Sequence, residues 1–386
     1  RVGLWPAAEE KWSDAAYLEA SLAAYEGGVQ ALANTARGGE ARRNKLFTYF
    51  KAGEGAAWEK PPVGTVRMRM SDFLRHRGYG EQREVPLLQP AGVAARDVCL
   101  YLQSTLLERK DGGAEMHVAP GVGEEMRADV ARLNLRRLSQ LQAAGDFGQW
   151  RVSQLFVGTS AASGARSLIH FDHSDNIFLQ ICGAKRFRIF PPEEAGRLYA
   201  YPCAHPMDRK AQVDLTKTSA QQAAAFPRFA GARSCEVVLR AGEVLFLPAF
   251  WWHEVLTEDI PPNELCVSVN FWFDVDLEKK LSIPLRPAMR LELSRELEKL
   301  VGLVCGTRHT AAFLEALIQQ QREVQSGICR VLPNEHPPLG VDSCDWGRLL
   351  DFVLWKAALL LGPHQVLPFL ENLCSPDRFR TCEARR

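Results

Sequence analysis

The chain has 386 residues, of which 46% are hydrophobic and 24% charged, and its formal net charge is +1. These are ordinary globular values, with enough residues for one large domain or two smaller ones. The balanced charge provides no strong field that would attract nucleic acid. No apolar run reaches the roughly 18 residues of a membrane span, so we expect no membrane association.

The ten cysteines are irregularly spaced and form no Cys-x-x-Cys pair. Zinc-ribbon and redox motifs therefore have no support, and a disulfide framework is not expected in a chain of this length. We expect reduced thiols and an intracellular protein, placed in the cytoplasm, the nucleus or both.

Residues 1–150 are predicted to form a mixed region that packs on the core and completes it. Residues 1–60 are predicted to be mostly helical, because alanine-rich stretches favour helix. A strand is expected over residues 97–107, where β-branched and aromatic residues gather. The other predicted elements are a helix around Asp72–Leu74, loops over Glu84–Gly92 and Gly112–Gly123, and a helix over Met126–Gln142.

Residues 151–280 carry short strand candidates that are separated by turn residues. Many short strands with tight turns favour a β-sandwich or barrel over a βαβ sheet. The segments Cys182-Gly183-Ala184 and Arg240-Ala241-Gly242 are predicted to be hairpin turns. The expected strands are Trp150–Val157, Asn176–Ile181, Lys185–Phe190, Ser234–Leu239, Glu243–Leu247 and Leu265–Phe273.

Residues 281–386 are predicted to form a helical region. The first helix, Pro287–Leu303, is amphipathic, with Leu291 and Leu297 among the positions expected to be buried. The remaining helices are expected at Ala311–Val324, Leu349–Leu361 and Val366–Leu373, with breaks at Gly302–Gly306 and Pro333–Gly340.

The segment Leu168-Ile169-His170-Phe171-Asp172 places a histidine and an aspartate two residues apart. On a strand, residues i and i+2 face the same side, so both side chains can converge on one metal ion. A third ligand is expected from His253, which follows an apolar strand candidate. Two histidines and one carboxylate form a facial triad that suits iron(II) and leaves coordination positions open, whereas zinc prefers a closed tetrahedral set.

Two other histidines are weaker candidates for this metal site. His173 directly follows Asp172 and therefore faces the opposite side of a strand. His205 lies in a polar loop. We expect neither to be a ligand.

Lys185 is a candidate partner for 2-oxoglutarate, whose keto acid end chelates iron and whose distal carboxylate needs a cation with hydrogen-bond support. Lys185 shares a strand face with Phe187, which favours an inward position. The residues alone leave an exposed strand lysine equally open.

A series of segments between Ile169 and Phe273 resembles the JmjC-domain oxygenases, and most closely the asparaginyl hydroxylase that inhibits hypoxia-inducible factor. The resemblance implies a mainly β core, a double-stranded β-helix of the jelly-roll or cupin type, flanked by helices. The matching segments are His170-Phe171-Asp172, Asn176 to Arg186, Phe190-Pro191-Pro192, Tyr201-Pro202, His205 to Asp214, Phe226-Pro227, Gly242 to Pro248, Trp251-Trp252-His253 and Val269 to Trp272, with weaker similarity over Tyr101 to Leu106 and at Trp5-Pro6-Ala7.

The resemblance implies roles for individual residues. Iron(II) would be bound by His170, Asp172 and His253, with 2-oxoglutarate and O2 as cosubstrates. The distal carboxylate of 2-oxoglutarate would contact Lys185 and Tyr101. The other implied cosubstrate residues are Ser167, which stands where the family has a threonine, and the asparagines Asn176 and Asn270, for which strand-end hydrogen bonding is the alternative.

Gln103, Arg209 and Lys210 are the candidate substrate-binding residues. The asparaginyl hydroxylase has, at the position of Lys210, a glutamine that binds the target amide. An amide both donates and accepts, whereas an ammonium only donates. We therefore expect a target that offers a carboxylate or another oxygen-rich group.

The resemblance implies hydroxylation of a protein side chain, most simply at the β-carbon of Asn or Asp, with release of succinate and CO2. Hydroxylation of a modified tRNA base, histone lysine demethylation and an inactive scaffold remain open. A protein or peptide partner is favoured over nucleic acid, because phosphate contacts need clustered basic residues. The helices Pro287–Leu303 and Ala311–Val324 fall where the family forms a homodimer; the alternative is that they pack on their own barrel.

Overall fold

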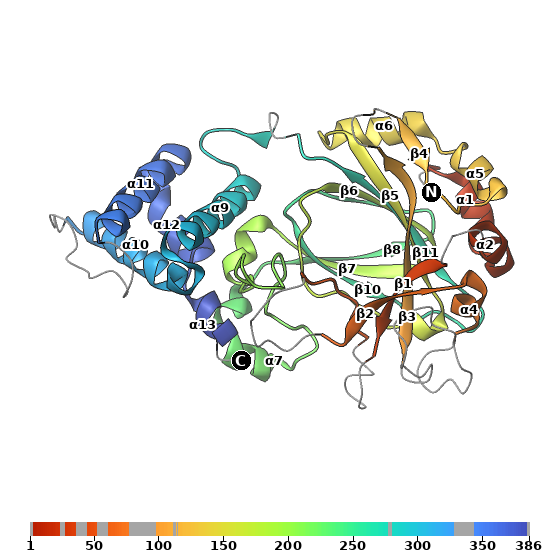
Figure 1. The fold of residues 1–386 in the computed structure, drawn as a ribbon, viewed down its shortest axis with the longest axis horizontal. Helices are drawn as coiled ribbons and strands as arrows, with labels where there is room; N and C mark the ends of the chain where they lie inside the picture. The colour runs from red at the N-terminus through yellow and green to blue at the C-terminus, as the bar shows by residue number, and fades with distance from the viewer. Residues whose placement is uncertain are drawn as a thin grey trace.

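The computed structural model describes residues 3–23, 28–35, 45–51, 61–76, 98–110, 113, 115–276, 280–327 and 343–383. The strands within these residues are β1 (Val29–Asn34), β2 (Val63–Met68), β3 (Cys99–Arg109), β4 (Met116–Val118), β5 (Trp150–Gly158), β6 (Asp175–Cys182), β7 (Ala184–Phe190), β8 (Cys235–Arg240), β9 (Val244–Leu247), β10 (Trp252–Thr257) and β11 (Cys266–Phe273). They form two antiparallel sheets, a large one in the order β2-β1-β3-β5-β11-β6-β9 with β4 on β3, and a small one in the order β10-β7-β8 (Figure 1). The core is a cupin-type jelly roll.

Both predicted hairpin turns carry the chain from one sheet to the other, so the hairpin prediction is wrong. β6 pairs with β9 and β11, whereas β7 pairs with β8 and β10. The turns at Gly183 and Gly242 therefore join strands of different sheets. Because the chain passes from one sheet to the other at Gly183, Phe178 of β6 and Phe187 of β7 face each other in the core. The centroids of their rings lie 5.0 Å apart. This apolar contact is available only when the two strands face each other across the core.

All six strands predicted within residues 151–280 are present, each within one residue of its expected bounds. The sequence does not predict β10. Its first three residues, Trp252, His253 and Glu254, are all buried, so apolar and polar residues do not alternate as they do in a half-exposed strand.

The prediction that residues 1–60 are mostly helical is only partly correct. The helices α1 (Pro6–Lys11) and α2 (Ala15–Leu22) are present, but β1 lies between β2 and β3 as an inner strand of the large sheet. Ala31 and Ala33 of β1 are buried. Burial in the sheet overrides the helical preference of alanine.

The other predictions for the first 150 residues have mixed outcomes. The strand at residues 97–107 corresponds to β3, and Asp72–Leu74 lies in α4 (Met70–Arg75). The predicted glycine-rich loop contains β4. The single helix predicted over Met126–Gln142 is two helices, α5 (Glu124–Val130) and α6 (Leu135–Ala144), because Asn134 caps the second one, its Oδ1 accepting the N–H of Arg137 at 2.9 Å. The Glu84–Gly92 prediction lies outside the described residues.

Helices α1, α2, α5 and α6 cover the outer face of the large sheet (Figure 1). Asp129, near the end of α5, joins α1 and α2 to α5. Its carboxylate accepts hydrogen bonds from Lys11 at 2.8 Å, Trp12 at 3.2 Å and the Tyr17 hydroxyl, and its carbonyl accepts from Trp5 at 2.7 Å. The helices α1 and α2 are thus tied to α5 through one buried carboxylate.

A second hydrophobic core lies between the sandwich and the C-terminal helices, at the left of Figure 1. It includes Phe171 and Trp252 from the sandwich and Leu297 and Phe313 from the helices. The helices are α9 (Pro287–Cys305), α10 (Thr310–Gln325), α11 (Ser343–Leu361), α12 (Val366–Leu373) and α13 (Asp377–Glu383). The predicted break at Gly302–Gly306 begins only at Gly306, which has φ +87°, and the predicted break at Pro333–Gly340 lies outside the described residues.

No single helix among the described residues is long and apolar enough to cross a membrane, although two sharply bent helix pairs, Pro287–Cys305 with Thr307–Gln325 and Trp346–Leu361 with Pro363–Arg380, satisfy the length and hydropathy criterion together.

Candidate metal centre and cosubstrate cavity

His170, Asp172 and His253 bring their side chains together between the two sheets. One ligand atom from each lies within 4.8 Å of the others. Asp172 Oδ2 is 3.9 Å from His170 Nε2 and 3.6 Å from His253 Nε2. Two imidazole nitrogens and one carboxylate oxygen are a donor set that fits iron(II).

Backbone carbonyls orient both imidazoles toward this cluster. His170 Nδ1 lies 2.8 Å from the carbonyl oxygen of Leu168, and His253 Nδ1 lies 3.0 Å from that of Trp251. A carbonyl only accepts, so Nδ1 carries the proton and Nε2 keeps its lone pair for a metal. Burial, with the neighbouring His253, lowers the pKa of His170 to about 4, which keeps that ring neutral.

The segment that carries His170 and Asp172 is extended but does not form the predicted strand. It pairs through isolated bridges, and His170 exchanges two backbone hydrogen bonds with His253, at 3.0 and 2.7 Å. The two ligands nevertheless converge. At Asp172 the segment pairs with the turn before β10, where the carbonyl of Asp172 accepts the N–H of Phe250 at 2.8 Å.

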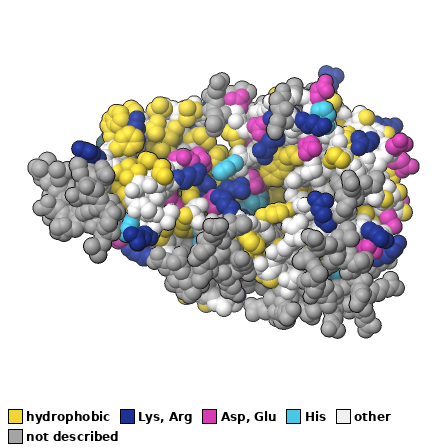
Figure 2. All heavy atoms as spheres, viewed as in Figure 1, with side chains coloured by type: hydrophobic (Ala, Val, Ile, Leu, Met, Phe, Trp, Pro, Cys, Tyr) yellow, Lys and Arg dark blue, Asp and Glu magenta, His cyan; other side chains and the backbone are white. Residues whose placement is uncertain are grey.

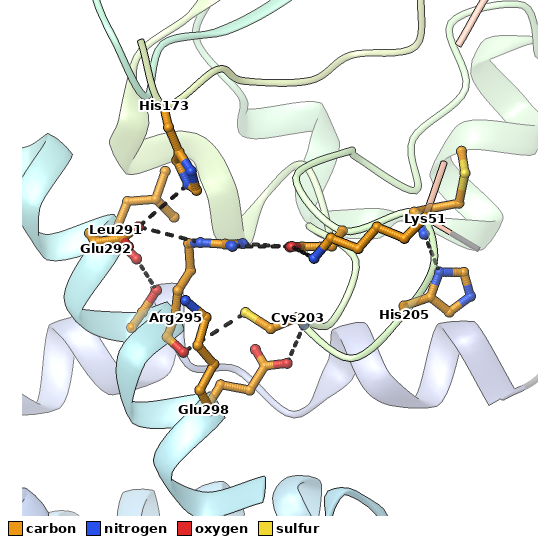
Figure 3. Close-up of polar contacts among 12 residues, drawn as sticks. Lys51, His173, Cys203, His205, Leu291, Glu292, Arg295 and Glu298 are labelled. Atoms are coloured by element: carbon orange, nitrogen blue, oxygen red, sulfur yellow. Dashed lines mark hydrogen bonds and ion pairs between the residues drawn. The ribbon is translucent and has the colours of Figure 1, made fainter. Parts of the chain in front are cut away.

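His173 and His205 lie outside the cluster, which is the one group of potential metal ligands found among the described residues. His173 points to α9, with its Nε2 3.7 Å from Glu292 Oε2 (Figure 3). His205 Nδ1 accepts the N–H of Met207 at 3.0 Å, and its ring stacks on Tyr201.

Lys185 is buried, with 2% of its side chain exposed, and reaches across the cavity from the small sheet. Its Nζ donates to Tyr101 Oη and to Ser268 Oγ, both at 2.6 Å. The rings of Phe156 and Phe178 lie 5.3 and 4.8 Å from this nitrogen. Burial lowers the pKa of Lys185 to about 8.

No described carboxylate pairs with Lys185, so its third N–H remains available. A buried ammonium without a counterion is costly. A bound anion at this position would remove that cost.

The candidate metal cluster, meaning the side chains of His170, Asp172 and His253, shares one cavity of about 330 Å³ with Lys185. All eleven predicted site residues line it: His170, Asp172, His253, Lys185, Tyr101, Ser167, Asn176, Asn270, Gln103, Arg209 and Lys210. The buried Oδ1 atoms of Asn176 and Asn270 have no hydrogen-bond partner among the described residues. Ser167 Oγ accepts the N–H of Val255 at 3.0 Å, which leaves its own proton free to donate.

Several polar and aromatic residues in the cavity wall or just behind it were not predicted from the sequence. Ser268 lies two residues before Asn270 on β11 and so shares its face, a parity signal that was available. Tyr49, Gln154 and Trp272 carry no motif. The Tyr49 hydroxyl donates to Gln103 Oε1, and Gln103 Nε2 donates to Gln154 Oε1 at 2.8 Å.

A second, more open cavity of about 540 Å³ adjoins the first and shares Gln154, Asp172, Arg209 and Trp272 with it. In Figure 2, Lys and Arg side chains gather with acidic and histidine side chains in the middle of the face that is drawn. Lys210 is only 9% exposed, and burial together with Arg209 lowers its pKa to about 8.

A jelly roll that encloses two histidines and a carboxylate is the architecture of a cupin-type metal protein. The chain belongs to the cupin-like domain family, whose model matches residues 2–279.

Similar proteins match parts of the chain. The HSPB1-associated protein 1 homolog of Danio rerio is 33% identical over 143 residues, 36% of this chain and 30% of that protein. The tRNA wybutosine-synthesizing protein 5 of Homo sapiens is 31% identical over 162 residues, 41% of this chain and 47% of that protein. The bifunctional peptidase and (3S)-lysyl hydroxylase JMJD7 of Homo sapiens is 26% identical over 137 residues, 31% of this chain and 42% of that protein. The matches thus span less than half of each relative.

Among solved structures, E. coli ycfD aligns with 88% of this chain and 58% of its own, at 14% identity and a TM-score of 0.30. The predicted closeness to the asparaginyl hydroxylase stays a prediction.

Proposed function

We propose that the chain is an iron(II)- and 2-oxoglutarate-dependent dioxygenase that hydroxylates a protein side chain and releases succinate and CO2. The observation that carries the proposal is the pairing, within one cavity, of a His/Asp/His cluster with a buried ammonium that has no counterion among the described residues. A 2-oxoglutarate molecule has a chelating keto acid at one end and a carboxylate at the other, so it suits both features.

Each residue has a role in this proposal. His170, Asp172 and His253 hold iron(II), which supplies oxygen activation when bound. Lys185 and Tyr101 bind the distal carboxylate of 2-oxoglutarate, the first as a cation and the second as a hydroxyl donor.

Further residues support the two ends of the cosubstrate. Ser167, which lines the cavity, and Ser268, whose Oγ accepts from Lys185 Nζ at 2.6 Å, add hydroxyl protons that can be donated. Asn176 and Asn270 position the chelating end through their side-chain amides. The apolar rings around Lys185 exclude water and strengthen its pairing with a carboxylate.

The proposed substrate is a protein side chain, with Asn/Asp-type β-hydroxylation as the specific reaction. One matched relative is named a (3S)-lysyl hydroxylase, which supports a side chain as the acceptor. Gln103, Arg209 and Lys210 are the proposed substrate contacts.

A tRNA base is the second candidate substrate. It is favoured by the relative named for wybutosine synthesis and by Tyr49 and Trp272, whose rings at the cavity offer stacking surfaces. Oxidised RNA without oxidised peptide would select this candidate.

We further propose an intracellular homodimer. The described cysteines are free, which supports a reducing compartment. Hydrophobic side chains gather over the C-terminal helices at the left of Figure 2, which supports association through this region.

The test of the activity is succinate formation from 2-oxoglutarate with iron(II) and O2. Wild-type chain is expected to form succinate, and His170→Ala and Asp172→Ala are expected to form none. His173→Ala is the matched control, because His173 is adjacent in sequence and faces α9. Undiminished succinate in His170→Ala or Asp172→Ala would refute the ligand assignment.

A further inference from the structure

Two consecutive cations, Arg209 and Lys210, stand at the border between the metal cluster and the open cavity. Both line the inner cavity, and Arg209 also lines the outer one. Within the described part of the chain, neither side chain forms a hydrogen bond or an ion pair. Lys210 is also nine-tenths buried. The charges of Asp172 and Asp208 act on Lys210, but Asp172 belongs to the metal cluster and Asp208 is bonded to Arg295 and Lys51. Buried ammonium groups are normally paired, so an anion from outside the chain suits this position.

The backbone holds this pair of cations in a constrained turn. Arg209 has φ +65°, a left-handed conformation that is uncommon for a residue with a side chain. The carbonyl of Arg209 accepts the N–H of Phe171 at 3.1 Å, between the two ligands His170 and Asp172. The turn and the metal cluster are therefore fixed relative to each other. Strained backbone of this kind persists where its surroundings determine it.

Asp208 is the residue through which the surroundings hold the turn. Its carboxylate accepts two hydrogen bonds from Arg295 of α9, at 2.6 and 3.2 Å, and one from Lys51 at 2.7 Å (Figure 3). Asp208 and Arg295 are both buried. A two-pronged guanidinium–carboxylate pair fixes orientation as well as distance.

Helix α9 also contacts Cys203, near the start of the loop that leads to Arg209 and Lys210. Glu298 of α9 accepts the backbone N–H of Cys203 (Figure 3). Its other carboxylate oxygen accepts from Arg378 of α13. Helix α9 therefore holds the loop that carries Arg209 and Lys210 at two points, Cys203 and Asp208.

We propose that Arg209 and Lys210 bind a carboxylate of an acidic peptide substrate beside the metal cluster, and that Asp208 and Arg295 are positioning residues for this pair. The proposal rests on the proposed function and names its substrate class. Two adjacent donors on a fixed turn suit one carboxylate, which can accept from both.

The outer cavity favours a peptide over RNA. Its other exposed cations are already paired: Arg151 with Asp274 at 3.6 Å, Lys299 with Glu296 at 2.6 Å, and Lys51 with Asp208 at 2.7 Å. RNA binding relies on a run of unpaired basic groups along the phosphates. Two unpaired cations suit a single acidic side chain.

The test measures binding of labelled peptides to the full metal-free chain by fluorescence anisotropy. Two peptide pools are identical except that a central position is Asp in one and Asn in the other, and a single-stranded RNA oligonucleotide is the third probe. Wild type is expected to bind the Asp pool at least tenfold more tightly, as expected for a charge-assisted pair. Lys210→Gln and Arg209→Gln are expected to reduce that ratio to about twofold or less. Lys110→Gln, which removes an exposed charge elsewhere, is the matched control.

Equal binding of the two pools, or tighter binding of the RNA, would overturn the proposal. So would an Asp/Asn affinity ratio that is unchanged in both Lys210→Gln and Arg209→Gln, or one that is lost only in Lys185→Met. The last result would place the carboxylate in the cosubstrate site. The two proposals fail in different ways. If the proposed function is wrong, the chain prefers the Asp pool but forms no succinate. If this inference is wrong, the chain forms succinate but shows no preference for the Asp pool.

The positioning role has its own readout. Arg295→Lys keeps the charge but loses the two-pronged geometry, so it is expected to lower the Asp/Asn ratio severalfold while the chain still melts cooperatively. Asp208→Asn is expected to lower the ratio in the same way. Lys51→Met leaves the pair between Arg295 and Asp208 intact and is expected to change the ratio less. A full ratio in Arg295→Lys would overturn the positioning role even if Asp208→Asn does not fold.

Discussion

Lys185 on β7 donates a hydrogen bond to the hydroxyl of Tyr101 on β3, with 2.6 Å between Nζ and Oη. The bond crosses the cavity and ties the small sheet to the large one. It also brings a cation and a hydroxyl donor to one point in an apolar wall. This arrangement is poorly suited to an empty pocket and well suited to a carboxylate.

Lys185→Met is expected to stabilise the ligand-free chain and to weaken 2-oxoglutarate binding. The substitution replaces a buried unpaired charge by an apolar side chain of similar length. It also removes a charge-assisted contact of about 2–3 kcal/mol, which corresponds to roughly 30- to 150-fold in affinity. Thermal melting and calorimetric titration of 2-oxoglutarate into metal-loaded protein check the two effects. Unchanged affinity would place the carboxylate elsewhere.

The stability of the ligand-free chain is expected to depend on pH through Lys185. Burial lowers its pKa from 10.5 to about 8 in the folded state. Between these values the unfolded chain binds the extra proton, so the free energy of unfolding rises with pH across this window. The difference between wild type and Lys185→Met should therefore change by up to about 1.4 kcal/mol per pH unit. Urea unfolding from pH 7 to 10.5 measures it, and a flat difference would contradict a buried, titrating Lys185.

Asp129→Ala is expected to destabilise the chain by about 3–5 kcal/mol, because it leaves several buried donors without their acceptor. Trp12 and Tyr17 donate to this carboxylate, which is 1% exposed. Urea unfolding followed by tryptophan fluorescence measures the loss. Asp14→Ala, at an exposed helix cap, is the control and should cost about 1 kcal/mol. Equal losses would mean that the N-terminal helices do not depend on Asp129.

Trp355→Asp is expected to convert the proposed homodimer into a monomer. Phe352, Trp355 and Leu359 lie on one face of α11 and are 45%, 60% and 55% exposed. A patch of this kind on a helix is typical of an interaction surface. Light scattering after size exclusion gives the mass, with Leu135→Asp, an equally exposed leucine on α6, as the control. A monomeric wild type would contradict the proposed dimer and would support the alternative that the predicted dimer helices, Pro287–Leu303 and Ala311–Val324, only pack on their own barrel.

The sequence predicts the strands of the core well because their signal is local. β6 and β11 combine β-branched and aromatic residues between turn residues, and such runs are visible without tertiary information. The pairing of β6 with β11 and β9, rather than with β7, depends on which faces bury each other across the core. That choice is a property of the whole sandwich, so the hairpin prediction failed.

The site could be predicted where spacing or resemblance carries the signal. His170 and Asp172 have a two-residue spacing, and Lys185 shares a face with Phe187. Tyr49 comes from a segment more than a hundred residues upstream of Asp172, without a motif, and only the fold brings it to the cavity. The clamp between Asp208 and Arg295 joins a loop to a distant helix, which is a contact that no local pattern records.

The most direct test of the central claim is an anaerobic titration of 2-oxoglutarate into the iron(II)-loaded chain, followed by its charge-transfer absorption. A new absorption band that saturates at one 2-oxoglutarate per chain is expected for wild type, with a much weaker affinity in Lys185→Met and no band in His253→Ala. Iron-loaded wild type that shows no absorption change with 2-oxoglutarate, or a band that persists unchanged in His253→Ala, would contradict the account.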